Sequence, residues 1–268
     1  MAWSWWNRAS TGSAPRTWRA EGIPGALARH AGVPGFDQAR LSAAHVLCVG
    51  AGGLIGHVAP ALARKGVGAL TIIDDDDVEP SNLNRQFFHA ADVGRNKAEA
   101  LAGRLLPICT AATRITAVPA AFEAAARGLV VGRADVAVVG VDNDAARLAA
   151  SRFFRAATTP VVFCAVSADA DHGYVLVQAP DGPCPACLMP DVSAGTRPCP
   201  GTPAVIDILQ AIGALATYAI DACLMARATS WNYRRFSLNR PAEDGAAAIP
   251  RRPACPNCGA DLEHYQIA

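Results

Sequence analysis

Short apolar runs and helical stretches alternate through the middle of this chain. The runs are typical of buried strands, and each is followed by a stretch with helical character. The strands are predicted at residues 46–49, 70–73, 114–118, 134–139 and 160–165, and the helices at residues 54–65, 97–106, 121–129 and 144–157. Because strands and helices take turns, we expect an α/β fold with a mostly parallel sheet and helices on both of its faces.

The rest of the chain departs from this alternation. Residues 172–178 alternate between apolar and polar positions and predict an antiparallel extension of the sheet, with which residues 233–238 are expected to pair. Residues 204–225 form a long apolar stretch that contains aspartates, so we expect a buried core helix and not a membrane span. Residues 1–40 have no sustained period and are predicted to be irregular.

The first predicted strand ends in a cluster of glycines, Gly50, Gly52 and Gly53, and the second strand ends in Asp74. Strand, glycine turn, helix, strand and acid form the layout of a dinucleotide-binding unit, which predicts a Rossmann-like fold. Glycines let backbone N–H groups approach a phosphate at a helix N-terminus, and the acid binds a ribose. An NAD-dependent dehydrogenase has the same layout up to this point, so the unit alone indicates only an adenosine nucleotide.

The residues that follow Asp74 separate these possibilities. Residues 81–86 read SNLNRQ, and Arg95 and Lys97 come next. These residues place one amide side chain and two or three cationic side chains just after Asp74, the acid expected to bind the ribose. A nucleoside triphosphate needs such a cluster, because its negative charges must be countered and held in line. A nicotinamide cofactor does not, so an NAD-dependent oxidoreductase is the disfavoured alternative.

These motifs resemble those of the ubiquitin-activating-like adenylyltransferases, the ThiF, MoeB and HesA group. The shared residues are Asp74 and Asp76, the SNLNRQ run at residues 81–86, the GRNK run at residues 94–97, and the pair Asp142 and Asn143. The resemblance extends from about residue 38 to the C-terminus. One position departs from the family. Ile55 lies where the family usually has glycine, and Gly56 follows one place later, which predicts a slightly altered start of the helix.

The resemblance implies a reaction and a set of roles. It implies that ATP and Mg²⁺ are bound, with the ribose on Asp74, the phosphates on Asn82, Arg85 and Lys97, and the metal on Asp142. The whole implied nucleotide site is Gly50, Gly52, Gly53, Asp74, Asp76, Asn82, Arg85, Lys97, Asp142 and Asn143, of which Arg85, Lys97 and Asp142 are catalytic. In the implied reaction, the C-terminal glycine carboxylate of a small ubiquitin-like protein attacks the α-phosphorus of ATP, and an acyl-adenylate forms as pyrophosphate leaves.

Nine cysteines include two CxxC pairs, Cys184 with Cys187 and Cys255 with Cys258. Each pair lies in a turn rich in proline and glycine. Four thiolates make a closed tetrahedral site, so we predict a structural zinc knuckle formed by residues 184–187 and 255–258. Zinc thiolates also indicate a reducing cytoplasm and not a disulfide framework. Unrelated free thiols and a redox-active CxxC are the alternatives.

Cys199 lies in the sequence RPCPGTP, in a cysteine loop predicted at residues 188–203, just before the long apolar helix. A loop thiol near a helix N-terminus can be a good nucleophile. In the family that this chain resembles, a loop cysteine at this place accepts the activated acyl group as a thioester or joins sulfur chemistry, and some members do not need it. Cys199 is therefore either a catalytic acceptor or a passive residue.

Composition changes this interpretation little. The chain has 268 residues, a net charge of +1 and a hydrophobic content of 51%, which suits one large domain or one domain with a small appendage. We expect an N-terminal extension at residues 1–40 and a ThiF/MoeB-like adenylation domain at residues 41–268. The near-zero charge gives no indication of nucleic acid or an anionic membrane as a partner, and no secretory signal is visible, so the cytoplasm is the expected location.

The subunit arrangement and the second chemical step are less fixed. By resemblance we expect a homodimer in which an N-terminal arginine reaches the triphosphate of the other subunit, with Arg29 preferred over Arg16 and Arg19. The carrier is either passed from a Cys199 thioester to a conjugating enzyme or, as a sulfur carrier, converted to a thiocarboxylate by a separate sulfurtransferase. Adenylation of a small molecule or a tRNA base is a further alternative, disfavoured by the CxxC pairs and the Cys199 loop. An inactive scaffold is disfavoured by the intact nucleotide motifs.

Overall fold

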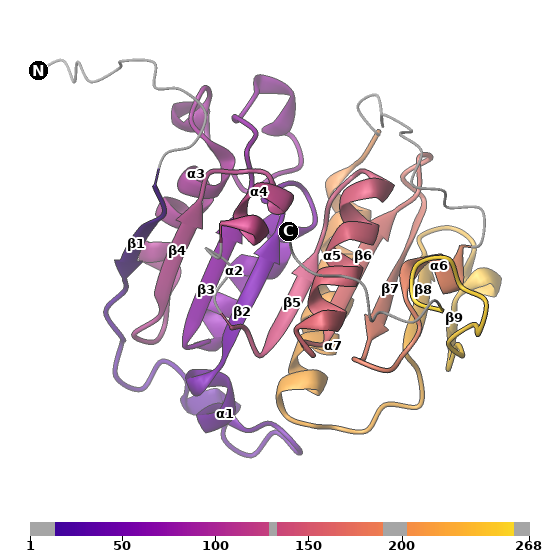
Figure 1. The fold of residues 1–268 in the computed structure, drawn as a ribbon. Coiled ribbons are helices and arrows are strands. Elements are labelled where there is room, and N and C mark those ends of the chain that lie inside the picture. Colours follow the sequence, from indigo (N-terminus) through magenta and orange to yellow (C-terminus); the bar gives the residue numbers. More distant parts are fainter. Residues whose placement is uncertain (1–13, 129–132, 190–202, 260–268) are drawn as a thin grey trace, which may run out of the picture.

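The computed structural model describes residues 14–128, 133–189 and 203–259. Over these residues the chain forms one nine-stranded sheet in the order β1-β4-β3-β2-β5-β6-β7-β8-β9 (Figure 1). The strands are β1 (Arg16–Arg19), β2 (His45–Val49), β3 (Ala69–Ile73), β4 (Arg114–Val118), β5 (Val136–Val139), β6 (Val161–Val166), β7 (His172–Gln178), β8 (Tyr233–Ser237) and β9 (Gly245–Ala247). The α-helices are α1 (Gln38–Ala43), α2 (Ile55–Lys65), α3 (Lys97–Leu105), α4 (Phe122–Arg127), α5 (Asp144–Ala156), α6 (Pro185–Leu188) and α7 (Ile206–Leu224).

The central strands of this sheet are parallel and the outer ones are antiparallel. β4, β3, β2, β5 and β6 pair in parallel, and β7, β8 and β9 continue the sheet in antiparallel pairs. The parallel strands are almost entirely apolar because helices cover both of their faces. The predicted fold class and the pairing of β7 with β8 are thus confirmed.

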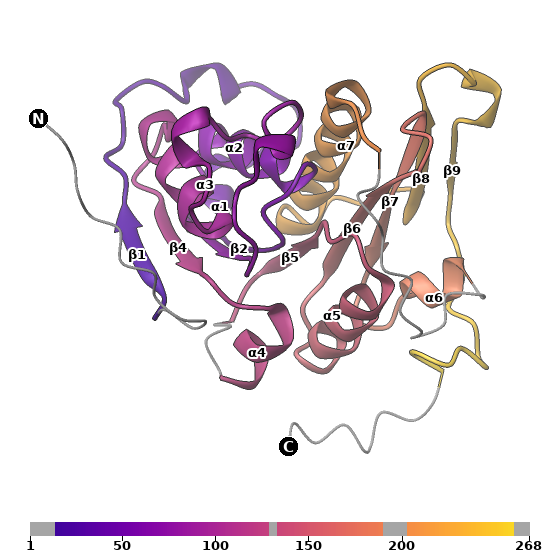
Figure 2. The ribbon, with the colours of Figure 1, turned by 90° about the horizontal axis from the view of Figure 1, so that it is seen from above.

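Helices cover both faces of the sheet (Figure 2). α2, α3 and α7 lie on one face, and α4 and α5 lie on the other, so each face has its own hydrophobic core. By length and composition alone, α7 is apolar enough to cross a membrane. Its buried side chains Ile208, Leu209 and Ile212 pack in the same core as α2 and the sheet, in agreement with the predicted core helix.

Part of the N-terminal segment is regular, which corrects the prediction that residues 1–40 are irregular. β1 pairs with β4 in antiparallel register, with Arg16 opposite Ala117. Its four residues RTWR lie at the edge of the sheet and are mostly exposed, so no alternation of apolar and polar positions marks them. β9 at the opposite edge is wholly exposed and was missed for the same reason.

The chain order reverses between β2 and β5, and this positions the site. After β2 the chain adds β3 and β4 on one side, and then crosses to add β5 and β6 on the other. Open parallel sheets bind ligands at such a switch point, beyond the carboxyl ends of the strands. Val49 pairs with both Ile73 and Val139, so the residues that follow β2, β3 and β5 lie along one edge of the sheet.

Candidate functional site

The turn after β2 is held tightly against its two neighbouring strands. Gly50 has a φ of +94°, and a Cβ on it would lie 3.3 Å from the carbonyl oxygen of Gly140, so only glycine fits comfortably. Its N–H donates to the carbonyl of Ile73 at 2.8 Å. Gly52 and Gly53 then lead into α2, so the turn presents backbone N–H groups at the start of a helix, as an anion site requires.

The departure at Ile55 has a structural explanation. Ile55 is fully buried at the start of α2, and a Cβ on Gly140 would lie 3.0 Å from its Cγ1 atom. The glycine that permits close packing therefore lies after β5 in this chain, opposite a large side chain on the helix. Gly56 instead faces the backbone of Phe87, whose nitrogen lies 3.1 Å from the position of an added Cβ. The helix begins one residue later than predicted, at Ile55.

Asp74 follows β3 and lies beside the glycine turn. One carboxylate oxygen accepts the N–H of Ala51 at 2.6 Å, and the other accepts the N–H of Asp76 at 2.9 Å. Burial raises the pKa of Asp74 to about 6, although Lys97 and the two N–H donors act to lower it. The side chain is therefore charged at neutral pH, with lone pairs left for ribose hydroxyls.

Lys97 is brought to Asp74 by the loop between β3 and α3. Its ammonium lies 2.8 Å from the carboxylate of Asp76, and its side chain is only 12% exposed. Asn96 fixes the loop, because its side-chain nitrogen donates to the carbonyls of Asp74 and Asp76 at 3.0 and 3.1 Å. Its side-chain oxygen caps α3 by accepting the N–H of Glu99 at 3.2 Å. Asn96 was not predicted, although an asparagine three residues before a glutamate signals such a cap.

The two predicted phosphate ligands of the SNLNRQ segment differ in their surroundings. Asn82 is 6% exposed, and its side-chain oxygen accepts the N–H of Glu79 at 3.0 Å, so it shapes the loop. Arg85 donates from one terminal nitrogen to the carbonyl of Ser81 at 2.6 Å and keeps further N–H donors for a ligand. Gln86, which was not predicted, has its amide nitrogen 3.9 Å from the place of a Cβ on Gly52, directly at the glycine turn.

Asp142 and Asn143 follow β5 on the other side of the turn. Asp142 is exposed and makes no hydrogen bond or ion pair with any part of the chain that the structure describes. Asn143 caps α5, because its side-chain oxygen accepts the N–H of Ala146 at 2.7 Å. An exposed, unpaired carboxylate at a strand end fits the oxygen ligand that Mg²⁺ prefers.

The four CxxC cysteines come together as predicted. Their sulfurs lie within 4.8 Å of one another, with separations of 3.5 Å between Cys184 and Cys255 and 3.4 Å between Cys187 and Cys258. Four thiolates around one zinc ion at its usual bond length are separated by about 3.8 Å. All four residues are buried, and the N–H of Arg252 donates to the sulfur of Cys187 at 3.4 Å. The donor set and its spacing therefore fit zinc.

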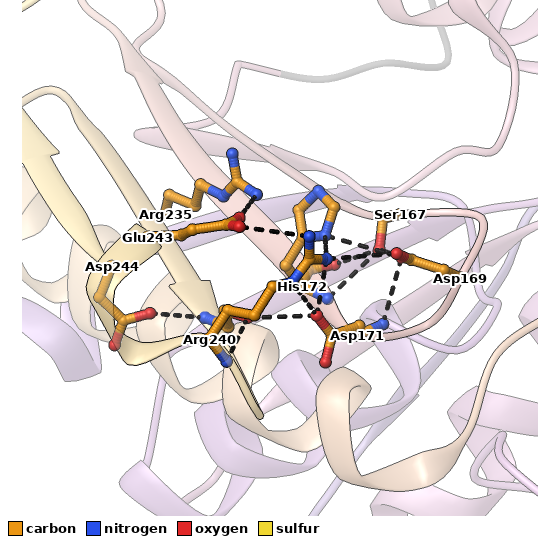
Figure 3. Close-up of polar contacts among 9 residues, drawn as sticks. Ser167, Asp169, Asp171, His172, Arg235, Arg240, Glu243 and Asp244 are labelled. Carbon is orange, nitrogen blue, oxygen red and sulfur yellow. Dashed lines mark hydrogen bonds and ion pairs between the residues drawn. The ribbon is translucent and has the colours of Figure 1, made fainter.

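A second polar cluster lies at the turn between β6 and β7 (Figure 3). Asp169, Asp171 and His172 offer possible metal ligands there. Arg240 already binds the carboxylates of this cluster, since its guanidinium lies 2.8 Å from Asp171 and 3.3 Å from Asp169 and also pairs with Glu243. The arrangement ties the β6–β7 turn to the segment after β8, which is a structural role.

The remaining predicted residues are Cys199 and the three N-terminal arginines. Cys199 and most of its loop lie outside the described residues. Arg16 and Arg19 lie on β1, where Arg16 pairs with Glu99 at 3.5 Å, and Arg29 is exposed in a 3-10 turn. The part of each arginine in the reaction stays a prediction.

Fold and site together define a nucleotide-binding α/β protein with a four-cysteine cluster. Comparison with known families assigns it further: the model of the ThiF family matches residues 26–257, and the chain belongs to this family. It is 33% identical to the SAMP-activating enzyme E1 of Haloferax volcanii, over 83% of each chain. It is 31% identical to the sulfur carrier protein ThiS adenylyltransferase of Escherichia coli, over 83% of this chain and 88% of that one.

Comparison with solved structures supports the fold. A crystal structure of E. coli MccB with MccA-N7isoASN superimposes with a TM-score of 0.70 at 22% identity, covering 83% of this chain and 69% of that one. At this identity the match bears on the fold alone. Because its relatives are named adenylyltransferases and activating enzymes, the chain is an enzyme of the adenylyltransferase type.

Proposed function

We propose that this enzyme uses ATP to adenylate the C-terminal glycine carboxylate of a small ubiquitin-like protein and then transfers the acyl group to Cys199. The main support is the convergence of the Gly50 turn, Asp74 with Lys97, and Asp142 at the carboxyl ends of three adjacent strands. The relatives named for SAMP activation and ThiS adenylylation support the same substrate class.

In the first step a carboxylate must approach a triphosphate that repels it. Asp74 accepts hydrogen bonds from the ribose hydroxyls, and Lys97 and Arg85 counter the charge of the phosphates. A carboxylate oxygen attacks the α-phosphorus, the bond between the α-phosphorus and the bridging oxygen breaks, and pyrophosphate leaves with the electron pair. Asp142 would hold Mg²⁺, which neutralises phosphate charge when it is bound. The product is a mixed anhydride of the carrier and AMP.

In the second step a thiol replaces AMP. The Cys199 thiolate attacks the acyl carbon, the bond to the AMP oxygen breaks, and AMP leaves as the thioester forms. A conjugating enzyme would then take the acyl group.

Four cysteines that fit zinc support a reducing, cytoplasmic location, and family membership supports a homodimer.

A second candidate shares only the first step. Similarity to a ThiS adenylyltransferase favours a sulfur-carrier pathway, in which a separate sulfurtransferase supplies sulfur and the adenylate becomes a thiocarboxylate. Cys199 then accepts no acyl group, so the two candidates differ in a covalent intermediate.

The test measures ATP–pyrophosphate exchange with candidate carrier proteins that end in glycine. We expect exchange only with a carrier, and its loss in Asp142→Ala with the fold retained. Cys199→Ala should keep the exchange and lose a reductant-sensitive adduct of enzyme and carrier. Exchange without the adduct in the wild-type enzyme would favour the sulfur-carrier reaction, and no exchange with any carrier would contradict adenylation of this substrate class.

A further inference from the structure

One face of α5 contacts both halves of the four-cysteine cluster. Leu148 is 4% exposed and packs in one hydrophobic cluster with the four cysteines and Ala186. Two turns later, Arg155 donates to the carbonyl of Gly182 at 2.6 Å and to that of Pro180, in the segment that leads to Cys184. These positions recur at helical spacing, so the contact runs along one side of the helix.

Asn257 lies between Cys255 and Cys258 and makes the polar part of this contact. Its side-chain nitrogen donates to the hydroxyl of Ser151 at 3.0 Å, and its oxygen accepts from Arg152 at 2.7 Å. The Ser151 hydroxyl in turn donates to the side chain of Gln178 on β7 at 2.6 Å. Ser151 and Gln178 are fully buried and Asn257 is 7% exposed, so no solvent replaces the two bonds of the Ser151 hydroxyl if one is lost.

The other end of α5 is the candidate magnesium site. The helix begins at Asp144, directly after Asp142 and the Asn143 cap. Ser151 lies eight residues beyond the cap, roughly 12 Å along the helix axis. A helix of this length moves as a unit, so whatever holds Ser151 also constrains the turn at its N-terminus.

We propose that Asn257 is a positioning residue through which the metal-bound cysteine cluster fixes α5, and with α5 the Asp142–Asn143 turn. Bound metal sets the geometry of the Cys255–Cys258 turn, which aims Asn257 at both Ser151 and Arg152. Loss of the metal frees that turn, and the two hydrogen bonds are not kept together. The link to catalysis, though not the contact itself, rests on the proposed function of Asp142.

Hydrogen exchange on the full chain tests the contact without reference to activity. In the zinc-loaded protein, chelation should speed amide exchange across residues 142–156 by about tenfold or more. Asn257→Ala should show the same faster exchange while it still holds zinc by metal analysis. Asn257→Asp keeps the acceptor for Arg152, so its rate of amide exchange should lie between those of the zinc-loaded wild type and Asn257→Ala.

The matched control is Asn232→Ala. Asn232 also makes two side-chain hydrogen bonds, both to the backbone of Ile249 at 2.8 Å and neither to α5. Its loss should leave exchange in residues 142–156 unchanged. If Asn257→Ala fails to fold, Ser151→Ala removes the same bond from the helix side.

Two results would overturn the proposal. In the first, chelation leaves the amide exchange of residues 142–156 unchanged. In the second, zinc-loaded Asn257→Ala or Ser151→Ala shows amide exchange in these residues no faster than that of Asn232→Ala. In the reaction, Asn257→Ala should raise the KM for Mg·ATP several-fold with a smaller effect on kcat. If chelation speeds amide hydrogen exchange but the protein shows no carrier-dependent ATP–pyrophosphate exchange, the result would support the α5 contact and count against the proposed function.

Discussion

At the scale of single residues, Asp74 combines two backbone hydrogen bonds with a raised pKa. Two backbone N–H groups bind its carboxylate, yet burial raises its pKa to about 6. The pKa of this carboxyl therefore lies close to neutral pH. Asp74 must nevertheless stay ionised to accept hydrogen bonds from ribose hydroxyls. Lys97 nearby favours the ionised form.

This pKa predicts how ATP binding depends on pH. Because the pKa of Asp74 is raised to about 6, the carboxyl takes up a proton as the pH falls through that value, and the neutral form is a poorer acceptor. Affinity should be full above neutral pH and fall by up to about tenfold per pH unit below the pKa. Calorimetric titration across this range measures it. Asp74→Asn should bind weakly and keep only the pH dependence of the nucleotide, so parallel profiles for the two proteins would contradict the assignment.

Lys97 should matter for catalysis and little for stability. We expect Lys97→Gln to lower carrier-dependent ATP–pyrophosphate exchange by about 100- to 1000-fold, the usual effect of removing one donor to the transition state. Its partner Asp76 is 69% exposed, so the free energy of unfolding should change by about 1 kcal/mol or less. Arg64→Gln, which removes an exposed cation from α2, is the control and should keep full exchange. A wild-type rate in Lys97→Gln would remove this residue from the mechanism.

At the scale of elements, the contact of α2 with the end of β5 depends on the sizes of Ile55 and Gly140. Gly140→Ala adds a methyl group 3.0 Å from Ile55, so the free energy of unfolding should fall by about 1–3 kcal/mol. Ile55→Ala alone should lower it by about 2–5 kcal/mol by leaving a cavity. The double variant should lose less than the sum, because the new methyl occupies part of that cavity. Urea unfolding of the four proteins measures the coupling, and strictly additive losses would show that the two residues act independently.

The elements also show what could be predicted from the sequence. The buried strands and their helices were predictable because apolar runs and helical stretches alternate, and Gly50, Asp74 and Asp142 were predicted to lie at strand ends. β1 and β9 were not predictable, since edge strands that are mostly exposed carry no apolar pattern. The helix cap by Asn96 could have been predicted from Glu99 three residues later, but its bonds to Asp74 and Asp76 could not, because only the fold brings these distant residues together. Gly140 was missed for the same reason, since its partner Ile55 is distant in the sequence.

At the scale of the whole molecule, the four cysteines join two segments that lie far apart in the sequence. Metal analysis should find about one zinc per chain, and a chelator should lower the melting temperature. Cys258→Ser should lose the metal, whereas Cys223→Ser, which changes a half-buried cysteine outside the cluster, should keep it. A metal-free protein that melts at the same temperature with and without chelator would contradict a structural zinc.

α7 covers the face of the sheet shared by β5, β6 and β7, but it follows all of them in the chain. On the ribosome, the parallel strands emerge well before the helix that shields them. Until residue 224 has left the exit tunnel, the apolar face of the sheet that α7 later covers is exposed to solvent. Nascent chains truncated before Ile206 should therefore bind chaperones or precipitate, and chains that extend past α7 should not.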